Sequence, residues 1–592
     1  PDPETRFNAA FCLNKLAIVE ENIQYIGESG SIPRLINMLT MLDEPDGVAQ
    51  ATAVLRHLAM RVENRVLMLQ ANCLDPVAPV AKVKDYETLR EVATLCCLLS
   101  LTDSIRMPIV ASNVIVPLTA LCGHEDVEIG RQACGALANC AEAKRTHKRL
   151  ATHAHAMHHM VFIMRSKHLA IHREAARCVS NLVSSSAFHR LFLDDGGLVS
   201  LFRLCRSLDK ETLYNCALIF RKLSPVLTNH EFIIGKGGIA PLLILTQTTE
   251  LETRRQASAA MRDLASNINY KSIMAEEGCL TRAIELTRDP DLHLRILGMG
   301  TIRHMSINTR VKRPIIQEGA LGPMFVAIED ELQDSDLVRQ TAAIIGNIAE
   351  NGENQIILVK DGVLPRLIHL SAFPHVEVQA DASRTYALLS SNAENHVGVF
   401  GAADVKAILK LTASEEEATK RDALVALGNI SVMIKNQLMI AKLGGLVAIS
   451  LALESSFESC QRFACRCMYR LSAHQELQRQ SLDSGAVPPL SKLCYSTSAL
   501  VRKFAAMALT NISVDERNQH LMAKLGVFPA LIKLLGDEEE VCARYSAMTL
   551  VNLSNEGNNQ ETIVMQGALP LLIKLATVQD TEAARYAGMV LA

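Results

Sequence analysis

Residues 499–536 read ALVRKFAAMALTNISVDERNQHLMAKLGVFPALIKLLG, and this stretch contains one repeating unit of the chain in full. Its first part is apolar at positions that share one face of a helix: Phe504, Ala505, Ala508, Leu509 and Ile512. Such a stripe is typical of a helix that packs against a core. We therefore expect a long helix over 499–513 with these five side chains on its buried face.

The rest of the stretch predicts two shorter helices. We interpret the polar letters DERNQ as a break and HLMAKLG as a two-turn helix that ends at Gly526, because Gly accepts a left-handed backbone at low cost. Pro529 then falls in the first turn of the next helix, where its missing N–H costs no hydrogen bond. Each unit is thus predicted to contain a short first helix, a kink, a second helix and a long third helix.

The unit recurs along the whole chain. Fourteen anchor positions near the ends of the long helices mark it: Lys15, His57, Leu98, Asn139, Asn181, Lys222, Asp263, His304, Asn347, Leu388, Asn429, Arg470, Asn511 and Asn552. Their spacings are ten of 41, two of 42 and one of 43 residues. Fifteen residues after each anchor lies the kink position: Gly30, Asn72, Asn113, Ala154, Gly196, Gly237, Gly278, Gly319, Gly362, Ala403, Gly444, Gly485, Gly526 and Gly567. This period predicts a solenoid, so we expect residues 1–592 to form a single continuous array.

Two of these units carry a family resemblance. The strings RKFAAMALTNISVDERNQHLMAKLGVFPALIKLL and RYSAMTLVNLSNEGNNQETIVMQGALPLLIKLA resemble armadillo repeats, the unit of β-catenin, plakoglobin and importin-α. The tetratricopeptide period of 34 does not fit, and HEAT units have two helices and no glycine kink. The resemblance covers essentially the whole chain. It implies an all-α, right-handed superhelical solenoid of about fourteen three-helix repeats, whose third helices line a concave groove.

Composition narrows the function classes and the compartment. The net charge of −3 offers no overall attraction to nucleic acid or to an anionic membrane. The 16 Cys lie mostly in apolar helical patterns, which is typical of buried thiols in a reducing compartment. No apolar run approaches the roughly 18 residues of a membrane span. We expect a cytoplasmic protein without direct membrane insertion. Because both ends stop within the same helical segment, we interpret the chain as a fragment of a longer protein.

One face of the third helices is predicted to bind a partner. The anchor and the residues four, seven and eight before it lie opposite the apolar stripe. In similar families an Asn at the anchor holds the main-chain amide of an extended peptide, since its side chain donates and accepts at once. Six anchors are Asn: Asn139, Asn181, Asn347, Asn429, Asn511 and Asn552. The alternative for each is a hydrogen bond within its own repeat. Importin-α sets a Trp four residues before this Asn, and because the chain has no Trp we do not expect nuclear-import cargo.

The same face is predicted to be basic. Twenty Lys or Arg but only five acids occupy its positions, which favours an acidic, extended ligand. Four Arg have an acid three residues earlier on the same helix and are expected to be neutralised by it: Arg90, Arg131, Arg255 and Arg339. The basic residues that such pairs explain least are our candidates for partner binding: Arg173, Arg177, Arg221, Lys222, Arg262, Arg303, Arg384, Arg462, Arg466, Arg470 and Lys503.

Other reactive side chains do not form a recognisable catalytic or metal motif. The stretch THKRLATHAHAMHHM, residues 146–160, contains five His, but their spacing matches no zinc motif, so we expect structural or solvent-facing side chains. Cys460, Cys465 and Cys467 are expected to be buried thiols. GKGG at 235–238 lacks the spacing of a phosphate-binding loop. We therefore expect no catalytic residue, no metal, no cofactor and no enzyme activity.

The leading functional prediction is a non-catalytic adaptor that binds extended, partly acidic segments of other proteins along the groove. The alternative is a structural scaffold in a large cytoskeletal or ciliary axonemal assembly, where partners would be neighbours in that assembly. A third possibility is a substrate-recognition arm of an enzyme, but no catalytic module lies within these residues. Nucleic acid is not an expected partner.

Overall fold

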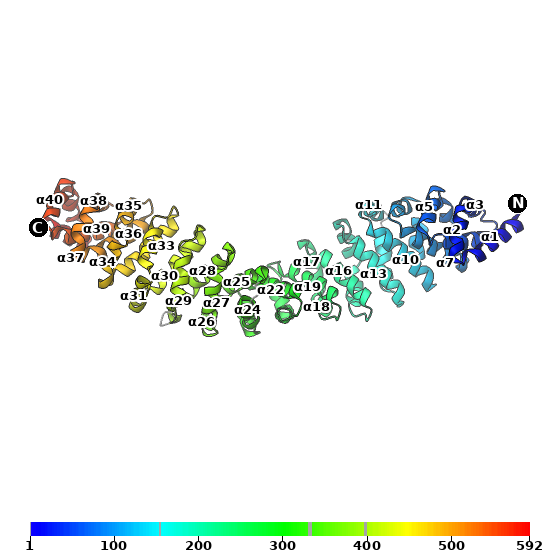
Figure 1. Ribbon diagram of the computed structural model, residues 1–592, viewed down its shortest axis with the longest axis horizontal. Helices are drawn as coiled ribbons and strands as arrows, with labels where there is room; N and C mark the ends of the chain where they lie inside the picture. Colours follow the sequence, from blue (N-terminus) through cyan, green and yellow to red (C-terminus); the bar gives the residue numbers. More distant parts are fainter. Residues whose placement is uncertain (1, 153–154, 330–333, 396–398) are drawn as a thin grey trace. The chain divides into compact units, whose positions relative to one another are not determined.

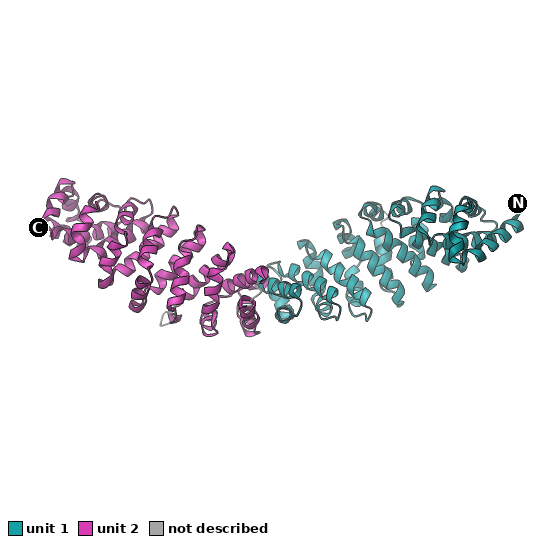
Figure 2. Ribbon diagram, in the orientation of Figure 1, with its two compact units in different colours: residues 1–304 teal, residues 305–592 magenta. Residues whose placement is uncertain are grey.

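The computed structural model describes residues 2–152, 155–329, 334–395 and 399–592. Every regular element in these ranges is a helix, which confirms the all-α prediction. The chain divides into two compact units, Pro1–His304 and Met305–Ala592 (Figure 2). Within each unit the helices follow one another as repeats of first, second and third helix (Figure 1).

The third helices are the longest elements, and consecutive ones pack against each other within each unit. They are α1 (Pro3–Ala17), α4 (Pro45–Leu58), α7 (Tyr86–Ser100), α10 (Val127–Glu142), α13 (Leu169–Leu182), α16 (Lys210–Leu223), α19 (Leu251–Ala265), α22 (Leu292–Ser306), α25 (Ser335–Ile348), α28 (Val376–Ser391), α30 (Glu417–Ile430), α33 (Glu458–Ser472), α36 (Ala499–Ser513), α39 (Glu540–Ser554) and α42 (Thr581–Leu591). The anchors lie near their C-terminal ends, as the sequence predicts.

The first helices are short, and most span two turns. They are α2 (Glu20–Glu28), α5 (Val62–Gln70), α8 (Asp103–Ala111), α11 (Lys144–Thr152), α14 (His189–Asp194), α17 (Leu227–Gly235), α20 (Lys271–Glu276), α23 (Lys312–Gln317), α26 (Gly352–Lys360), α31 (Ile434–Lys442), α34 (Gln475–Asp483), α37 (Glu516–Lys524) and α40 (Gly557–Met565). Two 3₁₀ turns, Ser186–Phe188 and Ala393–Asn395, follow α13 and α28.

The second helices cover the other side of the core. They are α3 (Ser31–Met38), α6 (Leu74–Val80), α9 (Ile115–Leu121), α12 (His155–Ile163), α15 (Gly197–Leu204), α18 (Ile239–Thr246), α21 (Cys279–Leu286), α24 (Leu321–Glu329), α27 (Val363–Ala372), α29 (Ala402–Leu411), α32 (Gly445–Leu453), α35 (Val487–Leu493), α38 (Phe528–Leu535) and α41 (Leu569–Leu575). Pro529 is the second residue of α38, as predicted.

The kink between first and second helices depends on a left-handed residue. All ten predicted Gly have φ between +74° and +95°, and Asn72 has φ +55°. The kink predicted at Asn113 is present but has no left-handed residue, and the kink predicted at Ala403 is wrong. Asn113 has no positive φ, because α8 instead ends at Ser112 in an extended conformation, and Ala403 lies inside α29. Ala154 lies outside the described residues.

Substitution of Gly526 should isolate the cost of this backbone conformation. A Cβ added there meets no atom within 4 Å, so only its φ of +76° opposes a side chain. We expect Gly526→Ala to lower the free energy of unfolding by about 1 kcal/mol. Gly526→Asn should cost clearly less, since Asn72 already occupies the same position in another repeat. Urea denaturation of the two variants checks this, and equal stability of both would contradict the explanation.

The interpretation of DERNQ as a break is wrong. α37 begins at Glu516, and the Asp515 side chain caps it by accepting the Arg517 N–H at 3.0 Å. Asn518 and Gln519 point inward and donate to the carbonyls of Ile512 and Ser513 at the end of α36, at 2.9 and 3.3 Å. These polar residues therefore belong to the helix because they satisfy carbonyls that the preceding helix leaves free.

The predicted buried stripe of α36 is confirmed at Ala505, Ala508, Leu509 and Ile512, which are fully buried. Phe504 is different, because it is half-exposed and lies at the border between the core and the opposite face of the helix. Its ring is 6.3 Å from that of Tyr469 in α33, centroid to centroid. An aromatic side chain is thus presented on the surface where the partner-binding residues were predicted.

No single helix of the described ranges is both long and apolar enough to cross a membrane. Two adjacent pairs reach that length and apolarity only when combined, and each pair is bent. The bend is 96° between α8 and α9 and 83° between α31 and α32.

Candidate functional site

The Asn residues predicted to bind a partner form hydrogen bonds between consecutive repeats. Their amide groups donate to the third helix of the preceding repeat. Four bond to a Ser hydroxyl, in the pairs Asn139–Ser100 (3.0 Å), Asn347–Ser306 (2.9 Å), Asn429–Ser390 (3.4 Å) and Asn552–Ser513 (2.9 Å). Two bond to a main-chain carbonyl, Asn181 to Ala138 (3.1 Å) and Asn511 to Tyr469 (2.9 Å). The donor side of each amide is therefore already used between repeats.

The acceptor side of these amides divides the six Asn into two groups. When the next third helix has an Arg four residues before its anchor, that Arg donates to the Asn carbonyl: Arg177 to Asn139 (2.9 Å), Arg384 to Asn347 (3.3 Å) and Arg466 to Asn429 (2.8 Å). Within the described residues, the side-chain carbonyls of Asn181, Asn511 and Asn552 accept no such bond. That these Asn bind a partner's main chain stays a prediction.

Most of the candidate basic residues of the first unit lie beside acids. The ion pairs are Arg173–Asp209 (2.6 Å), Arg177–Glu174 (2.8 Å), Arg177–Glu142 (2.9 Å), Arg221–Asp263 (2.7 Å) and Arg262–Asp263 (3.0 Å). Lys222 donates to the Ser180 carbonyl at 2.6 Å, and burial lowers its pKa. Arg303 is exposed on α22. In the second unit, Arg384 is paired with Glu350.

A longer-range rule accounts for several ion pairs. The Arg eight residues before an anchor pairs with an acid 36 residues later, at the start of the next third helix: Arg90–Asp126, Arg173–Asp209 (2.6 Å), Arg255–Asp291 (2.6 Å) and Arg544–Asp580 (2.9 Å). The predicted local partner of Arg90, Glu87, is therefore displaced, whereas Arg131 and Arg339 do pair three residues back. The sequence contains this spacing, but a search within single helices does not find it.

Four cations on α33 and α36 escape this neutralisation, and we call them the basic cluster: Arg462, Arg466, Arg470 and Lys503. The residue 36 positions after Arg462 is Ser498, which has no charge to offer. Lys503 has Glu539 at that spacing but forms no ion pair with it among the described residues. None of the four has a carboxylate within ion-pair distance in the described ranges, so their charge remains available to a partner.

Neighbouring groups hold the basic cluster in place without cancelling its charge. Arg466 is half-buried, and burial first, then the neighbouring Arg470 and Arg462, lower its pKa. Its guanidinium and that of Arg462 lie over the Phe463 ring, 5.4 and 4.6 Å from the centroid. Arg470 donates to the Gly428 carbonyl. Because like charges and an aromatic face surround Arg466, an incoming carboxylate would relieve repulsion as well as gain attraction.

Gly428 makes room for this arrangement. A Cβ there would lie 3.3 Å from Cys467 Sγ and 3.4 Å from Arg466 Nη2. A larger residue at this position would require Cys467 to move by a few tenths of an ångström and would crowd the Arg466 side chain where it reaches Asn429. Sequence reasoning identified the four cations but not this glycine, whose position one residue before an anchor is its only sequence signal.

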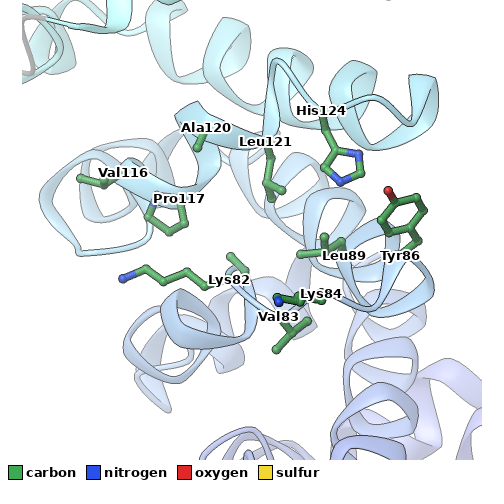
Figure 3. A pocket seen from close by; sticks show the side chains of 11 residues that line it. Lys82, Val83, Lys84, Tyr86, Leu89, Val116, Pro117, Ala120, Leu121 and His124 are labelled. Carbon is green, nitrogen blue, oxygen red and sulfur yellow. The ribbon is translucent and has the colours of Figure 1, made fainter.

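A pocket of about 710 Å³ lies in the first unit, outside the basic cluster (Figure 3). Leu89, Pro117 and Leu121 form part of its apolar lining, with Lys82 and Lys84 in the loop after α6. At its far edge the Tyr86 ring meets that of His124, with centroids 5.0 Å apart.

The histidine-rich stretch contains both a structural and a solvent-facing side chain, since His158 is exposed and lies 3.4 Å from Asp195. His147 is buried and its Nε2 lies 2.7 Å from the Ala141 carbonyl, so it caps α10. His189 and His230 cap the next two third helices in the same way, at 2.9 and 2.6 Å. His153 lies outside the described residues, as does the side chain of His155. In the described part of the chain, no three His, Cys, Asp or Glu side chains gather as a metal ion would require.

Comparison with known proteins is consistent with this geometry. Residues 401–565 match the family model described as armadillo-like. Vacuolar protein 8 of Candida albicans is 27% identical over 142 residues, which is 24% of this chain and 24% of that protein. Phospholipase A I of Arabidopsis thaliana is 28% identical over 141 residues, 23% of this chain and 11% of that protein. The matches thus span a quarter or less of these relatives.

Two solved structures share the fold over larger spans. The crystal structure of an engineered protein aligns with a TM-score of 0.57 and 24% identity, covering 67% of this chain and 98% of that one. A chain from a study of a phosphorylation switch in the cadherin and β-catenin interaction aligns with a TM-score of 0.57 and 14% identity, covering 88% and 100%. With its repeated three-helix units, its glycine kinks and the match at residues 401–565, the chain has an armadillo-like fold.

Proposed function

We propose that this chain is a non-catalytic adaptor that binds an extended, partly acidic segment of another protein along its third helices. An armadillo fold serves protein interaction in general, and the finer assignment rests on one observation. This is the basic cluster, whose four cations have no neutralising acid among the described residues, although most comparable cations do. Evenly spaced helices with partly exposed cations favour an acidic chain lying across them.

The same proposal extends to the organisation and location of the chain. The period of about 41 residues continues on both sides of residue 304, where one spacing lengthens to 43, and this supports one continuous array over residues 1–592. Cytoplasmic location fits the thiol chemistry, because most of the 16 Cys are buried. Burial raises the pKa of Cys467 to about 12 and that of Cys140 to about 12, so these thiols are unreactive.

Binding of an acidic probe tests the adaptor proposal. A fluorescent 20-residue peptide of Asp and Glu alternating with Ser should bind the full chain, and fluorescence anisotropy measures its affinity. Since the attraction is between exposed charges, affinity should fall by about tenfold between 50 and 300 mM salt. The matched control is the same peptide with Lys in place of the acids. Equal affinity for both peptides would contradict the proposal.

A further inference from the structure

Four consecutive third helices carry an aromatic residue at one structural position. Phe463, Phe504 and Tyr545 each lie seven residues before an anchor, and Tyr586 follows Tyr545 by the same period. The other third helices have a polar residue there, except for the buried Leu297: Asn8, Gln50, Glu91, Gln132, Glu174, Asn215, Gln256, Gln340, Asp381 and Asp422. The aromatic row is therefore confined to α33, α36, α39 and α42, and it coincides with the basic cluster.

The rings of this row form a partly exposed strip. All four are half-exposed, and Tyr469 adds a fifth ring that meets Phe504 at 6.3 Å with a tilt of 35°. The pKa of Tyr545 is raised by burial first and then by the charges of Tyr469, Glu582 and Tyr586, while Arg544 lowers it. In the described residues the hydroxyls of Tyr469, Tyr545 and Tyr586 have no hydrogen-bond partner, so they are available as donors.

Charge divides the strip into two halves. The half over α33 and α36 contains the basic cluster, which has no neutralising acid in the part of the chain that the structure describes. In the half over α39 and α42, Arg544 is paired with Asp580 at 2.9 Å and with Glu582 at 2.8 Å, and Arg585 is the other cation. This half is therefore close to neutral and mainly aromatic. A ligand charged along its whole length would match only one half.

The spacing of the row favours one backbone conformation. Packed helices lie about 8–10 Å apart, so successive rings should recur at about that interval. A polyproline II segment rises about 3.1 Å per residue with three residues per turn, so it repeats the same face every 9 Å or so. A β-strand presents alternate residues and does not repeat every third. Aromatic surfaces with free hydroxyls are suited to polyproline II segments, whose carbonyls point outward.

We propose that α33–α42 bind a partner segment in the polyproline II conformation, with an acidic flank over the basic cluster and apolar residues at every third position over the rings. This inference rests on the proposed adaptor function and specifies its partner. Acidic residues engage Arg462, Arg466, Arg470 and Lys503. Pro or Leu side chains pack between the rings of Phe504, Tyr545 and Tyr586, while the tyrosine hydroxyls donate to the segment's carbonyls.

Peptide probes separate this inference from the adaptor proposal. The test probe is EDEDEPLPPLPPLPP, and a second version carries the acidic part after the Pro and Leu part. Its control has the same composition, but the three Leu are consecutive and no longer recur at every third position. A third probe joins EDEDE to Gly and Ser, and a fourth is a 15-residue oligouridylate. All are titrated into the full chain by fluorescence anisotropy. In one of its two orders, the test probe should bind about tenfold more tightly than both peptide controls.

Variants assign the gain to the rings. The double variant Tyr545→Ser with Tyr586→Ser should lower the affinity of the test probe to that of the Gly and Ser probe. The affinity of the Gly and Ser probe itself should stay unchanged. Tyr545→Phe keeps the ring and should retain most of the gain in affinity. This variant provides the test if the double serine variant does not fold. Equal affinity of the three peptides would overturn the polyproline II inference and leave the adaptor. Failure of every acidic peptide would overturn both, and tighter binding of oligouridylate would replace both with a nucleic-acid function.

Discussion

Charge reversal at Lys503 should abolish most acidic-peptide binding without affecting the fold. Lys503 has no ion-pair or hydrogen-bond partner among the described residues, so its replacement removes attraction and no internal contact. We expect Lys503→Glu to weaken binding of the Asp and Glu probe by about tenfold. Adding Arg462→Glu should bring the loss to about 100-fold, since each reversal costs on the order of 1–2 kcal/mol.

A matched double variant serves as the control for that result. Lys442 and Lys524 are exposed at the ends of the first helices α31 and α37. Lys442→Glu with Lys524→Glu changes the net charge by the same amount at a distance from the basic cluster. Anisotropy titration of both double variants against one probe makes the comparison. An equal loss in both would mean that overall charge, and not the third-helix surface, governs binding.

Removal of the Asp537 carboxylate should produce the largest loss of stability. Its side chain is only 3% exposed and accepts two hydrogen bonds from Arg502 of α36, at 2.7 and 2.8 Å. Lys533 lies 3.3 Å away. Asp537→Ala leaves the largely buried Arg502 without its counter-charge, and we expect a loss of about 3 kcal/mol. Urea denaturation with hydrogen exchange of α36–α39 amides should measure it, since solenoids can unfold one part at a time.

The same carboxylate predicts how stability depends on pH. Burial alone would raise the pKa of Asp537. Hydrogen bonds from Arg502, from the Glu539 N–H and from Lys533 lower this pKa overall. Because the folded pKa lies below the unfolded one, its stabilisation is present above the unfolded pKa. It is lost as the pH falls towards the folded pKa. Asp483→Ala, which removes an exposed pair with Arg479, is the control and should cost less than 1 kcal/mol. A similar cost for both would contradict this account.

The sequence predicted the period, the helix order and the kinks because each depends on local chemistry. A left-handed backbone needs Gly or Asn, and ten Gly and Asn72 have it. DERNQ was misread because polar residues usually indicate a loop. Here Asn518 and Gln519 are buried to satisfy the carbonyls at the end of α36. That need exists only once two helices meet, so a pattern within one helix could not show it.

The candidate site was predictable in part for a similar reason. The charge count identified the basic face that stays our prediction for binding, but neutralisation depends on partners in other repeats, such as Asp209 for Arg173. Comparison of equivalent positions across repeats would have separated Arg462 from the paired cations, because the residue 36 positions after it is Ser498 and not an acid. The same comparison would have revealed the aromatic row, which a search for Trp alone passed over. Phe504 was assigned to the core because an aromatic residue next to an apolar stripe usually belongs to it.

The central claim is that partners lie along the third helices of the second unit. The most direct test is photo-crosslinking of the full chain with the peptide EDEDEPLPPLPPLPP carrying a benzophenone, followed by mass spectrometry of the joined residues. Our account predicts crosslinks within α33, α36 and α39, from Arg462 to Tyr545, and their loss in the Lys503→Glu and Arg462→Glu double variant. Crosslinks concentrated on the second helices α32, α35 and α38 would contradict it.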